Sequence, residues 1–328
     1  MKKEKLYIQR PRITNEDIEA VVEVLKSGNL VQGAKVAALE EKIANYTGAE
    51  YCSATSNGTS TLHLALLTLG IRPGDEVLVP AFSYVATANV VELVGATPVF
   101  VDIDIDTFNI KVEDILAKTT IRTRAIIPVH EFGLCANMPE IVKIAKERNL
   151  LVIEDAACAL GAEIDGIKAG NFGDFASFSL HPRKSITSGE GGLLVTSNDL
   201  HDKRVKILRN HGLEIKSKFS MDFSMAGYNY RLTDIQAALA LSQFNRLEQI
   251  IIHKKYNAEL YSKYLDKSKY VLPKVPDGYR HSWQSYHILV KNSKRDKLIE
   301  FLRTENIYLN YGAQCIPSLD YYVKKYNL

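Results

Sequence analysis

The chain is poor in cysteine and has almost no excess of charge. Only 4 of its 328 residues are cysteines, and they form no CxxC pair. Their spacing therefore indicates neither a metal site nor a disulfide framework, and it favours reduced thiols in a cytoplasmic protein. Because 41 basic side chains stand against 38 acidic ones, nothing points to nucleic acid or an anionic membrane as a partner.

Long apolar segments are also missing. No run approaches the length that a transmembrane helix needs. The first residues, MKKEKLYIQRPRI, are basic but lack the apolar stretch of a signal peptide. No internal repeat or low-complexity linker is present. A hydrophobic content of 46% and a charged content of 24% are typical of a globular protein, and the length allows one large domain with a smaller one.

Short apolar runs alternate with amphipathic stretches from about residue 35 to residue 200. This alternation predicts an α/β fold with a mostly parallel sheet and helices on both faces. Asn137 is expected to cap the last predicted helix of this region. The expected strands are 51–54, 76–79, 97–101, 125–129, 151–154, 176–180 and 192–196. The expected helices are 36–46, 60–69, 84–93 and 138–148.

The pattern changes in the last third of the chain. Residues 233–265 carry a helical periodicity that predicts one long helix. We expect this helix to join a large domain, residues 1–240, to a smaller C-terminal α/β domain, residues 241–328. The smaller domain is predicted to contain a strand near 286–290 and a helix over 295–304.

Two residues stand out because each follows an apolar run. Asp155 ends LVIED, and Lys184 follows a second run in SFSLHPRKSITSGEGG. A lysine can carry pyridoxal phosphate (PLP) covalently, and a carboxylate can keep the ring nitrogen of this cofactor protonated, so that the ring accepts electrons. Each residue alone has an ordinary interpretation as well: Asp155 as a helix cap or a surface ion pair, and Lys184 as a solvated lysine.

Other candidate residues also lie at predicted strand ends. The run TSNGTST at 55–61 begins a helix, where N–H groups could hold a phosphate or merely form a cap. Ser179 could donate to a phosphate, and Tyr84 could stack on a planar ring or pack in the core. His130 could be catalytic or structural. The segment GYNYR at 227–231 could be a turn or a ligand loop.

Six segments in order resemble the motifs of the DegT/DnrJ/EryC1/StrS family over about residues 8–322. They are SNGTSTLHLAL, PAFSYVATAN, IPVHEFG, IEDAA, SFSLHPRKSITSGEGG and GYNYRLTDIQAA. The resemblance implies the aspartate-aminotransferase-like fold called fold-type I, with a three-layer α/β/α large domain and PLP as cofactor. It also implies transfer of an amino group from an amino acid, usually glutamate, to a keto-sugar nucleotide, for the synthesis of amino sugars and polysaccharides.

The resemblance also implies roles for single residues. Lys184 matches the lysine that carries PLP and moves protons, and Asp155 matches the partner of the pyridine nitrogen. The phosphate is expected to bind Ser179 and the backbone of Gly58 and Thr59.

Further assignments concern the ring face, the substrate and a second subunit. Tyr84 matches the aromatic residue that stacks on the ring. Asn229 matches an asparagine that reaches the phosphate of the neighbouring subunit, which implies an obligate homodimer with shared active sites. Arg231 and His130 are expected to lie near the sugar nucleotide.

Two departures from the family pattern bear on function. Cys158 stands where the family usually has a glutamine that touches the phenolic oxygen of the cofactor, and a thiol is a poorer donor. Relatives usually continue beyond Leu328, so we expect an incomplete small domain with uncovered apolar surface around Ile307, Leu309 and Ile316.

Two alternative functions fit the same fold. One is a PLP-binding regulatory or sensor protein, and the other is a PLP-dependent sugar dehydratase. The presence of Lys184 argues against the dehydratase, because that branch of the family has histidine in place of the lysine.

Overall fold

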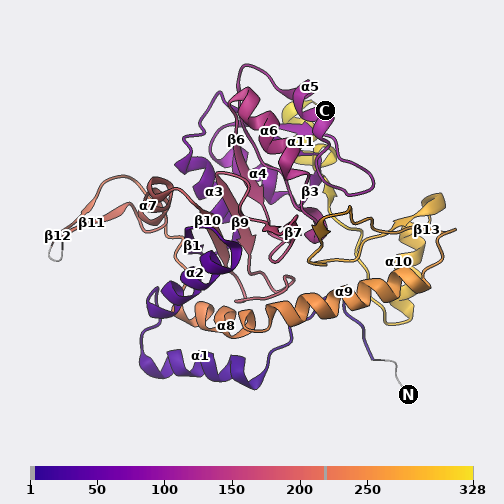
Figure 1. Cartoon of the computed structure of the whole chain (residues 1–328), viewed down its shortest axis with the longest axis horizontal. Coiled ribbons are helices and arrows are strands. Elements are labelled where there is room, and N and C mark those ends of the chain that lie inside the picture. The colour runs from indigo at the N-terminus through magenta and orange to yellow at the C-terminus, as the bar shows by residue number, and fades with distance from the viewer. Residues whose placement is uncertain (1–3, 218–219, 328) are drawn as a thin grey trace.

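A seven-stranded sheet forms the centre of the computed structural model, which describes residues 4–217 and 220–327 (Figure 1). Its strands are β1 (Tyr51–Thr55), β2 (Glu76–Pro80), β4 (Thr97–Val101), β5 (Thr123–Ile126), β6 (Leu151–Asp155), β9 (Phe175–Ser179) and β10 (Gly192–Thr196). They lie in the order β1-β10-β9-β6-β5-β2-β4. Only the pairs that involve β10 are antiparallel, which confirms the expected mostly parallel sheet.

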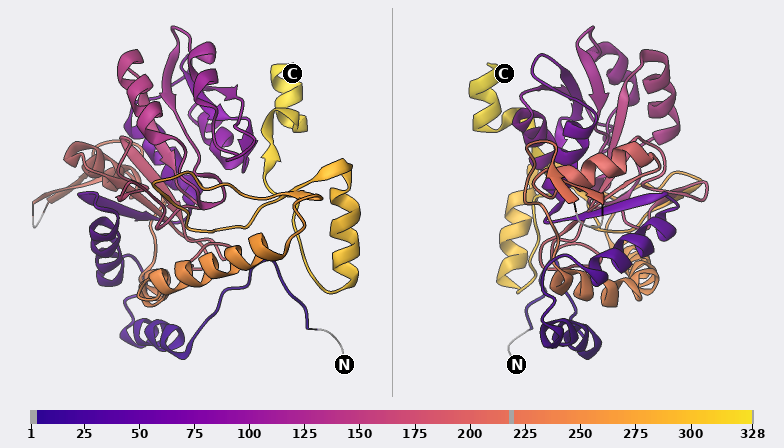
Figure 2. Two further views of the ribbon diagram at one scale, coloured as in Figure 1. Left: turned by 45° about the vertical axis from the view of Figure 1, so that its right-hand side comes forward. Right: turned by 90° about the vertical axis from the view of Figure 1, so that its left-hand side faces the viewer.

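Helices cover both faces of this sheet (Figure 2). Along β2, Leu78 packs into the core on one face, whereas Val77 and Val79 pack into the core on the other. A strand buried on both sides needs a continuous apolar run. One face carries α2 (Ala34–Thr47), α5 (Val112–Lys118) and α6 (Met138–Arg148). The other carries α3 (Gly58–Thr68), α4 (Ala86–Leu93) and α7 (Asp199–Leu208). The expected three layers are therefore present.

Strand β5 is shorter than the expected strand 125–129. It ends at Ile126, because Pro128 has no N–H with which to continue the ladder. Val129 rejoins the sheet only through a single bridge to Asp155. The carbonyl oxygen of Pro128 still accepts a hydrogen bond of 2.9 Å from the Asp155 N–H, so the end of β6 stays fixed against this segment.

The long helix expected over 233–265 is divided into two. Helix α8 ends and α9 begins around Arg246, whose backbone leaves the helical region at φ −109° and ψ 3°. The Arg246 guanidinium instead pairs with the buried carboxylate of Asp17, with Nη2 and Oδ2 2.9 Å apart. Asp17 lies on α1, an N-terminal helix that the sequence pattern did not predict. The bounds are Asn15–Ser27 for α1, Asp234–Phe244 for α8 and Leu247–Tyr264 for α9.

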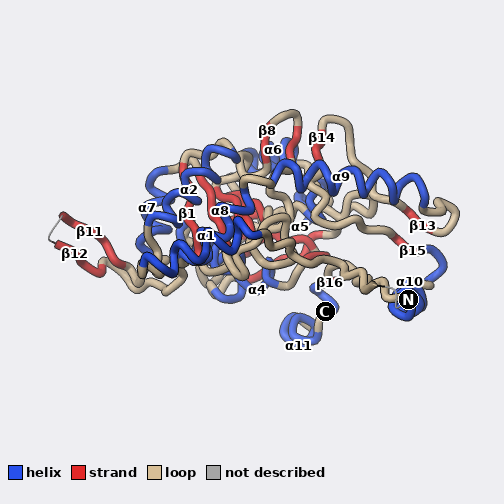
Figure 3. The backbone as a smooth tube through the Cα atoms, turned by 90° about the horizontal axis from the view of Figure 1, so that it is seen from below, coloured by secondary structure: helices blue, strands red, loops and turns tan. Residues whose placement is uncertain are grey.

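The C-terminal segment beyond α9 forms a small α/β unit and then returns to the large sheet. Figure 3 shows the small unit and the hairpin of β11 (Leu213–Ser217) and β12 (Ser220–Phe223) at opposite ends of the molecule. The strand expected near 286–290 is shorter in the structure and comprises only the two residues of β15. The helix expected over 295–304 is confirmed. The elements are β13 (Tyr270–Val271), β15 (Leu289–Val290), α10 (Arg295–Thr304), β16 (Gln314–Cys315) and α11 (Asp320–Tyr326).

The end of the chain packs against the large sheet. Strand β16 pairs with β3 (Phe82–Ser83). Ile316 and Tyr322 are fully buried, and Tyr322 Oη donates to Asn89 Oδ1 over 2.7 Å. Of the three residues expected to be uncovered, Ile316 is therefore buried, Ile307 is half-buried and Leu309 is 36% exposed. The domain boundary after residue 240 stays a prediction, but this last segment joins the core of the large domain.

Short strands complete the fold. Strands β11 (Leu213–Ser217) and β12 (Ser220–Phe223) form an exposed hairpin that projects from the body (Figure 1). Strands β14 (Tyr279–Arg280), β7 (Glu163–Ile164) and β8 (Ile167–Lys168) form a small antiparallel sheet. Among the helices of residues 4–217 and 220–327, none has the length and apolar character to cross a membrane.

Candidate active site

The carboxyl ends of three strands bring the predicted residues to one edge of the sheet. Strand β6 ends at Asp155 and β9 ends at Ser179, while β1 ends at Thr55, just before α3. Strands β6 and β9 are parallel. Strand β1 runs in the same direction, because β10 lies between β9 and β1 and is antiparallel to both. This edge is where open α/β sheets bind ligands. Lys184 lies in the loop that follows Ser179.

Asp155 is a buried carboxylate held by two donors. Thr87 Oγ1 donates to Asp155 Oδ2 over 2.8 Å, and the Ala157 N–H donates to Oδ1 over 3.2 Å. Burial raises the pKa of Asp155, while these hydrogen bonds and the charge of Lys184 oppose the rise. Within the described ranges Asp155 forms no ion pair. It is therefore a buried acceptor that lacks a direct cationic partner.

Thr87 was not predicted as a site residue. It lies in the first turn of α4, three positions after Tyr84, so the motif FSYVATAN contains both. The Thr87 N–H donates to the Tyr84 carbonyl oxygen over 3.2 Å. Tyr84 thus begins the turn that aims Thr87 at Asp155, and its own side chain is 67% exposed. The ring of Tyr84 is therefore open to solvent, and its expected stacking on the cofactor stays a prediction.

Lys184 points at Cys158. Lys184 Nζ lies 3.1 Å from Cys158 Sγ, and the two side chains line one small cavity together with Ser179, Ser185 and Gln284. Burial raises the pKa of the Cys158 thiol, while the positive charge of Lys184 opposes this rise. Burial also opposes the charge on Lys184, but nearby Cys158, Asp155 and Glu131 outweigh it and raise the pKa of the ammonium.

Two glutamines from distant parts of the chain hold the Lys184 loop. Gln9 Nε2 donates to the Lys184 carbonyl oxygen over 3.1 Å. Gln284 Nε2 donates to the Arg183 carbonyl oxygen and to Gln9 Oε1. Neither glutamine was predicted, because their sequence neighbourhoods carry no motif. Together they fix the backbone from which the Lys184 side chain extends.

The start of α3 forms a cradle beside Ser179. Asn57 caps the helix by accepting from the Ser60 N–H, which leaves the N–H groups of Gly58 and Thr59 at the open end of the helix. A Cβ on Gly58 would lie 3.1 Å from Ser179 Cβ. A side chain at position 58 would therefore crowd Ser179 at this separation. Helix N–H groups beside a hydroxyl suit a phosphate, which the helix dipole also attracts.

Glu131 is a second buried carboxyl group that was not predicted. It follows His130 in a short 3-10 helix, η1 (Glu131–Gly133), and is 6% exposed. Burial, together with the negative charge of Asp155, raises the pKa of Glu131 to about 8, although Lys184 opposes this. Its only sequence signal is an acid next to a strand end in IPVHEFG.

His130 lies in the core behind the site rather than in it. Its side chain is fully buried, and its Nε2 is 2.9 Å from Glu154 Oε2. Its Nδ1 accepts a hydrogen bond from the Ala136 N–H over 3.1 Å. Both ring nitrogens are thus used within the protein. This geometry favours the structural interpretation of His130, and its expected contact with the sugar nucleotide stays a prediction.

Asn229 and Arg231 lie beside the phosphate cradle but contact other groups. Arg231 Nη1 donates to Asn210 Oδ1 over 2.7 Å, and the Arg231 backbone forms a bridge to Thr55. Asn229 is exposed, and its backbone pairs with Asn210. In the described part of the chain, no hydrogen bond joins the Asn229 side chain to Lys184, Asp155 or Ser179 of the same chain. The structure therefore does not bring Asn229 into the site of its own subunit.

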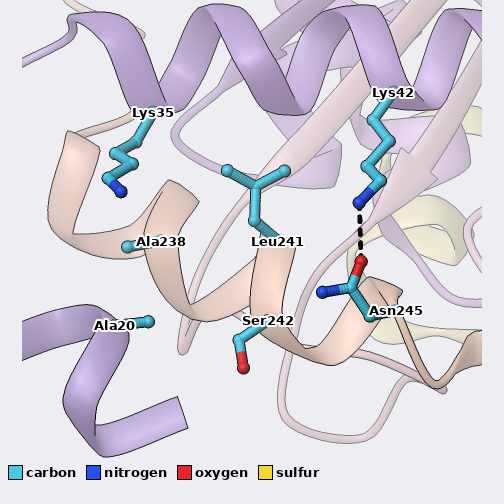
Figure 4. Close-up of a pocket in the computed structure, with 7 residues that line it drawn as sticks. All are labelled: Ala20, Lys35, Lys42, Ala238, Leu241, Ser242 and Asn245. Carbon is cyan, nitrogen blue, oxygen red and sulfur yellow. Dashed lines mark hydrogen bonds between the residues drawn. The ribbon is translucent and has the colours of Figure 1, made fainter. Parts of the chain in front are cut away.

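A larger hollow lies elsewhere, between α1, α2 and α8 (Figure 4). Figure 4 shows Lys35 and Lys42 reaching toward it from α2, with Lys42 Nζ donating to Asn245 Oδ1 over 2.6 Å. The hollow is open and contains none of the residues described above. Its lining residues are Ala20, Lys35, Lys42, Ala238, Leu241, Ser242 and Asn245. We therefore place the candidate active site at the smaller cavity around Lys184.

The residues at this cavity fit PLP. PLP needs a lysine that binds its aldehyde carbon, a carboxylate beside its pyridine nitrogen and anion-binding groups around its phosphate. Lys184 lines the cavity, Asp155 offers a carboxylate that forms no ion pair within the described residues, and the start of α3 places the Gly58 and Thr59 N–H groups beside Ser179.

Comparison with known proteins gives the same result. The family model of the DegT/DnrJ/EryC1/StrS aminotransferases matches residues 11–327. GDP-perosamine synthase of Escherichia coli O157:H7 is 36% identical over 325 residues, which is 97% of this chain and 87% of that protein. The UDP-N-acetyl-3-dehydro-alpha-D-glucosamine 3-aminotransferase of Acidithiobacillus ferrooxidans is 37% identical over 296 residues, which is 90% of this chain and 79% of that protein.

Solved structures agree with the sequence relatives. The putative sugar aminotransferase Spr1654 from Streptococcus pneumoniae, in its PMP-form, superimposes with a TM-score of 0.93 at 29% identity. The superposition covers 98% of this chain and 87% of that one. The same protein is also known in a PLP-form. With the site geometry and the full-length family match together, the chain belongs to the DegT/DnrJ/EryC1/StrS family of PLP-dependent aminotransferases.

Proposed function

We propose that this chain moves an amino group from an amino acid, with glutamate as the expected donor, to a keto-sugar nucleotide. The product would be an amino sugar for polysaccharide biosynthesis. The observation that carries the proposal is the meeting of Lys184, Asp155 and the α3 cradle at one edge of the sheet. The names of the relatives, which refer to GDP- and UDP-linked sugars, support the substrate class.

The proposed roles of the residues follow from their contacts. When bound, PLP supplies a protonated pyridine ring that accepts the electron pair released as a C–H bond breaks. The Asp155 carboxylate, held by Thr87, keeps the proton on the ring nitrogen. Lys184 Nζ moves the proton between the substrate carbon and the cofactor carbon. Ser179, Gly58 and Thr59 bind the phosphate.

We further propose a cytoplasmic homodimer in which each active site borrows Asn229 from the partner. Asn229 is exposed and makes no side-chain contact with the described site residues of its own chain. Arg231 is proposed to meet the sugar nucleotide from the same loop. The four cysteines, Cys52, Cys135, Cys158 and Cys315, are free thiols, which suits a reducing compartment.

The decisive experiment separates the two half-reactions. The PLP-loaded enzyme is mixed with glutamate, and its visible absorbance is followed as PLP is converted to the amine form. The amine form is then offered a panel of keto-sugar nucleotides, and products are identified by mass spectrometry. A complete first half-reaction with a sugar amine formed in the second supports the proposal. An unchanged spectrum with every amino acid would favour a regulatory protein instead.

Lys184→Ala gives the first test at a single residue. The variant should fold and bind PLP without covalent attachment, and transamination should be lost, because among the described residues only Lys184 has its amine against Cys158. Borohydride reduction of the wild-type enzyme, followed by peptide mapping, should place the pyridoxyl group on Lys184. A label on a different lysine would disprove the assignment.

A further inference from the structure

A second lysine approaches the Lys184 loop from the helix below it. Helix α9 runs along the lower side of the molecule in Figure 1. Its buried residues are Leu247, Ile251 and Ala258, and they define the face that packs on the protein; Ile251 and Ala258 are seven positions apart. Lys254 lies between them at helical spacing, so it shares this face. The neighbouring Lys255 is exposed.

Contacts fix Lys254 against the active site. Lys254 Nζ lies 3.0 Å from Ser185 Oγ. Ser185 follows Lys184 in the chain and lines the same cavity as Lys184 and Cys158. One turn earlier on α9, Ile251 packs so closely on Gly161 that a Cβ there would lie 2.3 Å from Ile251 Cδ1. Helix α9 is thus held against the turn that carries Cys158.

The charge of Lys254 has little compensation. Two other lysines with a shielded amine are paired with carboxylates: Lys168 with Glu163 at 2.7 Å, and the more exposed Lys206 with Asp202 at 2.6 Å. Across residues 4–217 and 220–327, Lys254 has no carboxylate partner, and its one hydrogen bond goes to a hydroxyl. Burial lowers the pKa of Lys254 to about 8; Cys158 opposes this shift, and the charge of Lys184 adds to it.

A structural role does not explain such a residue. A methionine or leucine on the buried face of α9 would pack without the cost of desolvating an ammonium group. A cation without a counter-charge beside a ligand cavity is instead suited to an anion that arrives with the ligand. The phosphate of the cofactor has its own cradle at Gly58, Thr59 and Ser179, and none of these residues contacts Lys254 in the described structure.

We propose that Lys254 binds an anionic oxygen of the substrate, a carboxylate of the amino donor or a phosphate of the sugar nucleotide, and holds that substrate beside Lys184. This inference deepens the proposed function and rests on it. It adds a substrate-binding residue on α9 that is separate from the phosphate cradle. The two sources of the anion share one chemistry and are separated by experiment.

The test uses the PLP-loaded enzyme and three variants. Lys254→Met removes the charge and keeps the length of the side chain, and Lys254→Arg keeps the charge. Lys255→Met is the matched control, because it removes a lysine from the solvent side of the same helix. Binding of glutarate, which mimics a dicarboxylate donor, and of inorganic diphosphate is measured by calorimetry. The KM and kcat of each half-reaction and the affinity for PLP are measured alongside.

Lys254→Met should weaken one probe by about tenfold or more, because a charge-assisted hydrogen bond is lost. The KM of the matching half-reaction should rise, whereas Lys254→Arg stays within about threefold of wild type and Lys255→Met is unchanged. Weaker glutarate binding identifies the donor, and weaker diphosphate binding identifies the nucleotide. Unchanged binding of both probes, or a loss confined to PLP affinity, would overturn the inference. Because the probes do not react, this outcome is independent of whether the wild-type enzyme transaminates.

Discussion

At the scale of single residues, Asp155 is the group on which the proposed chemistry depends most. An amide at this position cannot hold the proton of the pyridine nitrogen, so Asp155→Asn should lower kcat by about 10²- to 10³-fold, as losses of preorganised electrostatic groups do. Thr87→Val, which removes only one donor to the carboxylate, should cost about tenfold. Melting temperatures of both variants near the wild-type value would show that the loss concerns catalysis and not folding. Near-normal turnover of Asp155→Asn would show that Asp155 does not belong to the active site.

Glu131 should make stability depend on pH. Its pKa of about 8 in the folded protein is above its usual value of 4.5, so the folded state keeps a proton that the unfolded chain releases. The free energy of unfolding should therefore fall as pH rises between about 4.5 and 8, by an amount on the order of a few kcal/mol. In Glu131→Gln this contribution is absent. Denaturant titrations of the two apoenzymes at several pH values give the difference, and parallel pH profiles would contradict the buried acid.

The residue scale also shows what the sequence could not reveal. Lys184 and Asp155 were predicted because each ends an apolar run and belongs to a motif. Thr87, Glu131 and Lys254 were missed, because a hydroxyl, an acid and a lysine acquire roles only through neighbours distant in sequence. The structural contact of His130 was hidden from the sequence for the same reason: its partner Glu154, which precedes Asp155 on β6, lies against its ring nitrogen.

At the scale of elements, the close approach of α3 to β9 can be tested. Gly58→Ala introduces a Cβ 3.1 Å from Ser179 Cβ, which should push the start of the helix away from the phosphate site. We expect a loss of PLP affinity of about tenfold, while the melting temperature of the apoenzyme changes little, since alanine favours helix. Equilibrium titration with PLP measures the effect. Removing the opposing Cβ with Ser179→Gly in the same chain should not restore affinity, because it also removes the hydroxyl. Unaltered affinity in Gly58→Ala would show that the cradle is elsewhere.

Elements with a single strong pattern were predicted well, and those shaped by distant contacts were not. The apolar runs of β6 and β10 fixed their positions almost to the residue, but no pattern in β10 reveals that it runs antiparallel. The break between α8 and α9 depends on Arg246 reaching Asp17 on α1. Asn137 does precede α6, but its side chain makes no cap hydrogen bond, and Pro139 in the first turn has no N–H to donate.

At the scale of the whole molecule, the proposed shared site predicts complementation. Chains carrying Lys184→Ala are mixed with chains carrying Asn229→Ala, each of which should be inactive or strongly impaired alone. In the mixed dimer, one site contains both defects and the other contains neither, so up to about half of the wild-type activity per site should return. Activity is compared with that of each parent after the mixed dimers are purified by two different tags. Purified mixed dimers without recovery, or a fully active monomer, would contradict the shared site.

The return of the chain to the large sheet limits how the C-terminal unit can move. Helix α9 leaves the sheet on one side, and β16 and α11 are fastened back to β3 and α4 on the other. Residues 265–313 are therefore a span anchored at both ends, not an arm with one free end. Between these two anchors, β14 pairs with β7 and Gln284 donates to the Arg183 carbonyl oxygen, so the span is also fastened in its middle and cannot swing away as a unit. Strand β3, one of the anchors, leads directly into the turn of Tyr84 and Thr87, so the C-terminal segment is tied to the residues that hold Asp155.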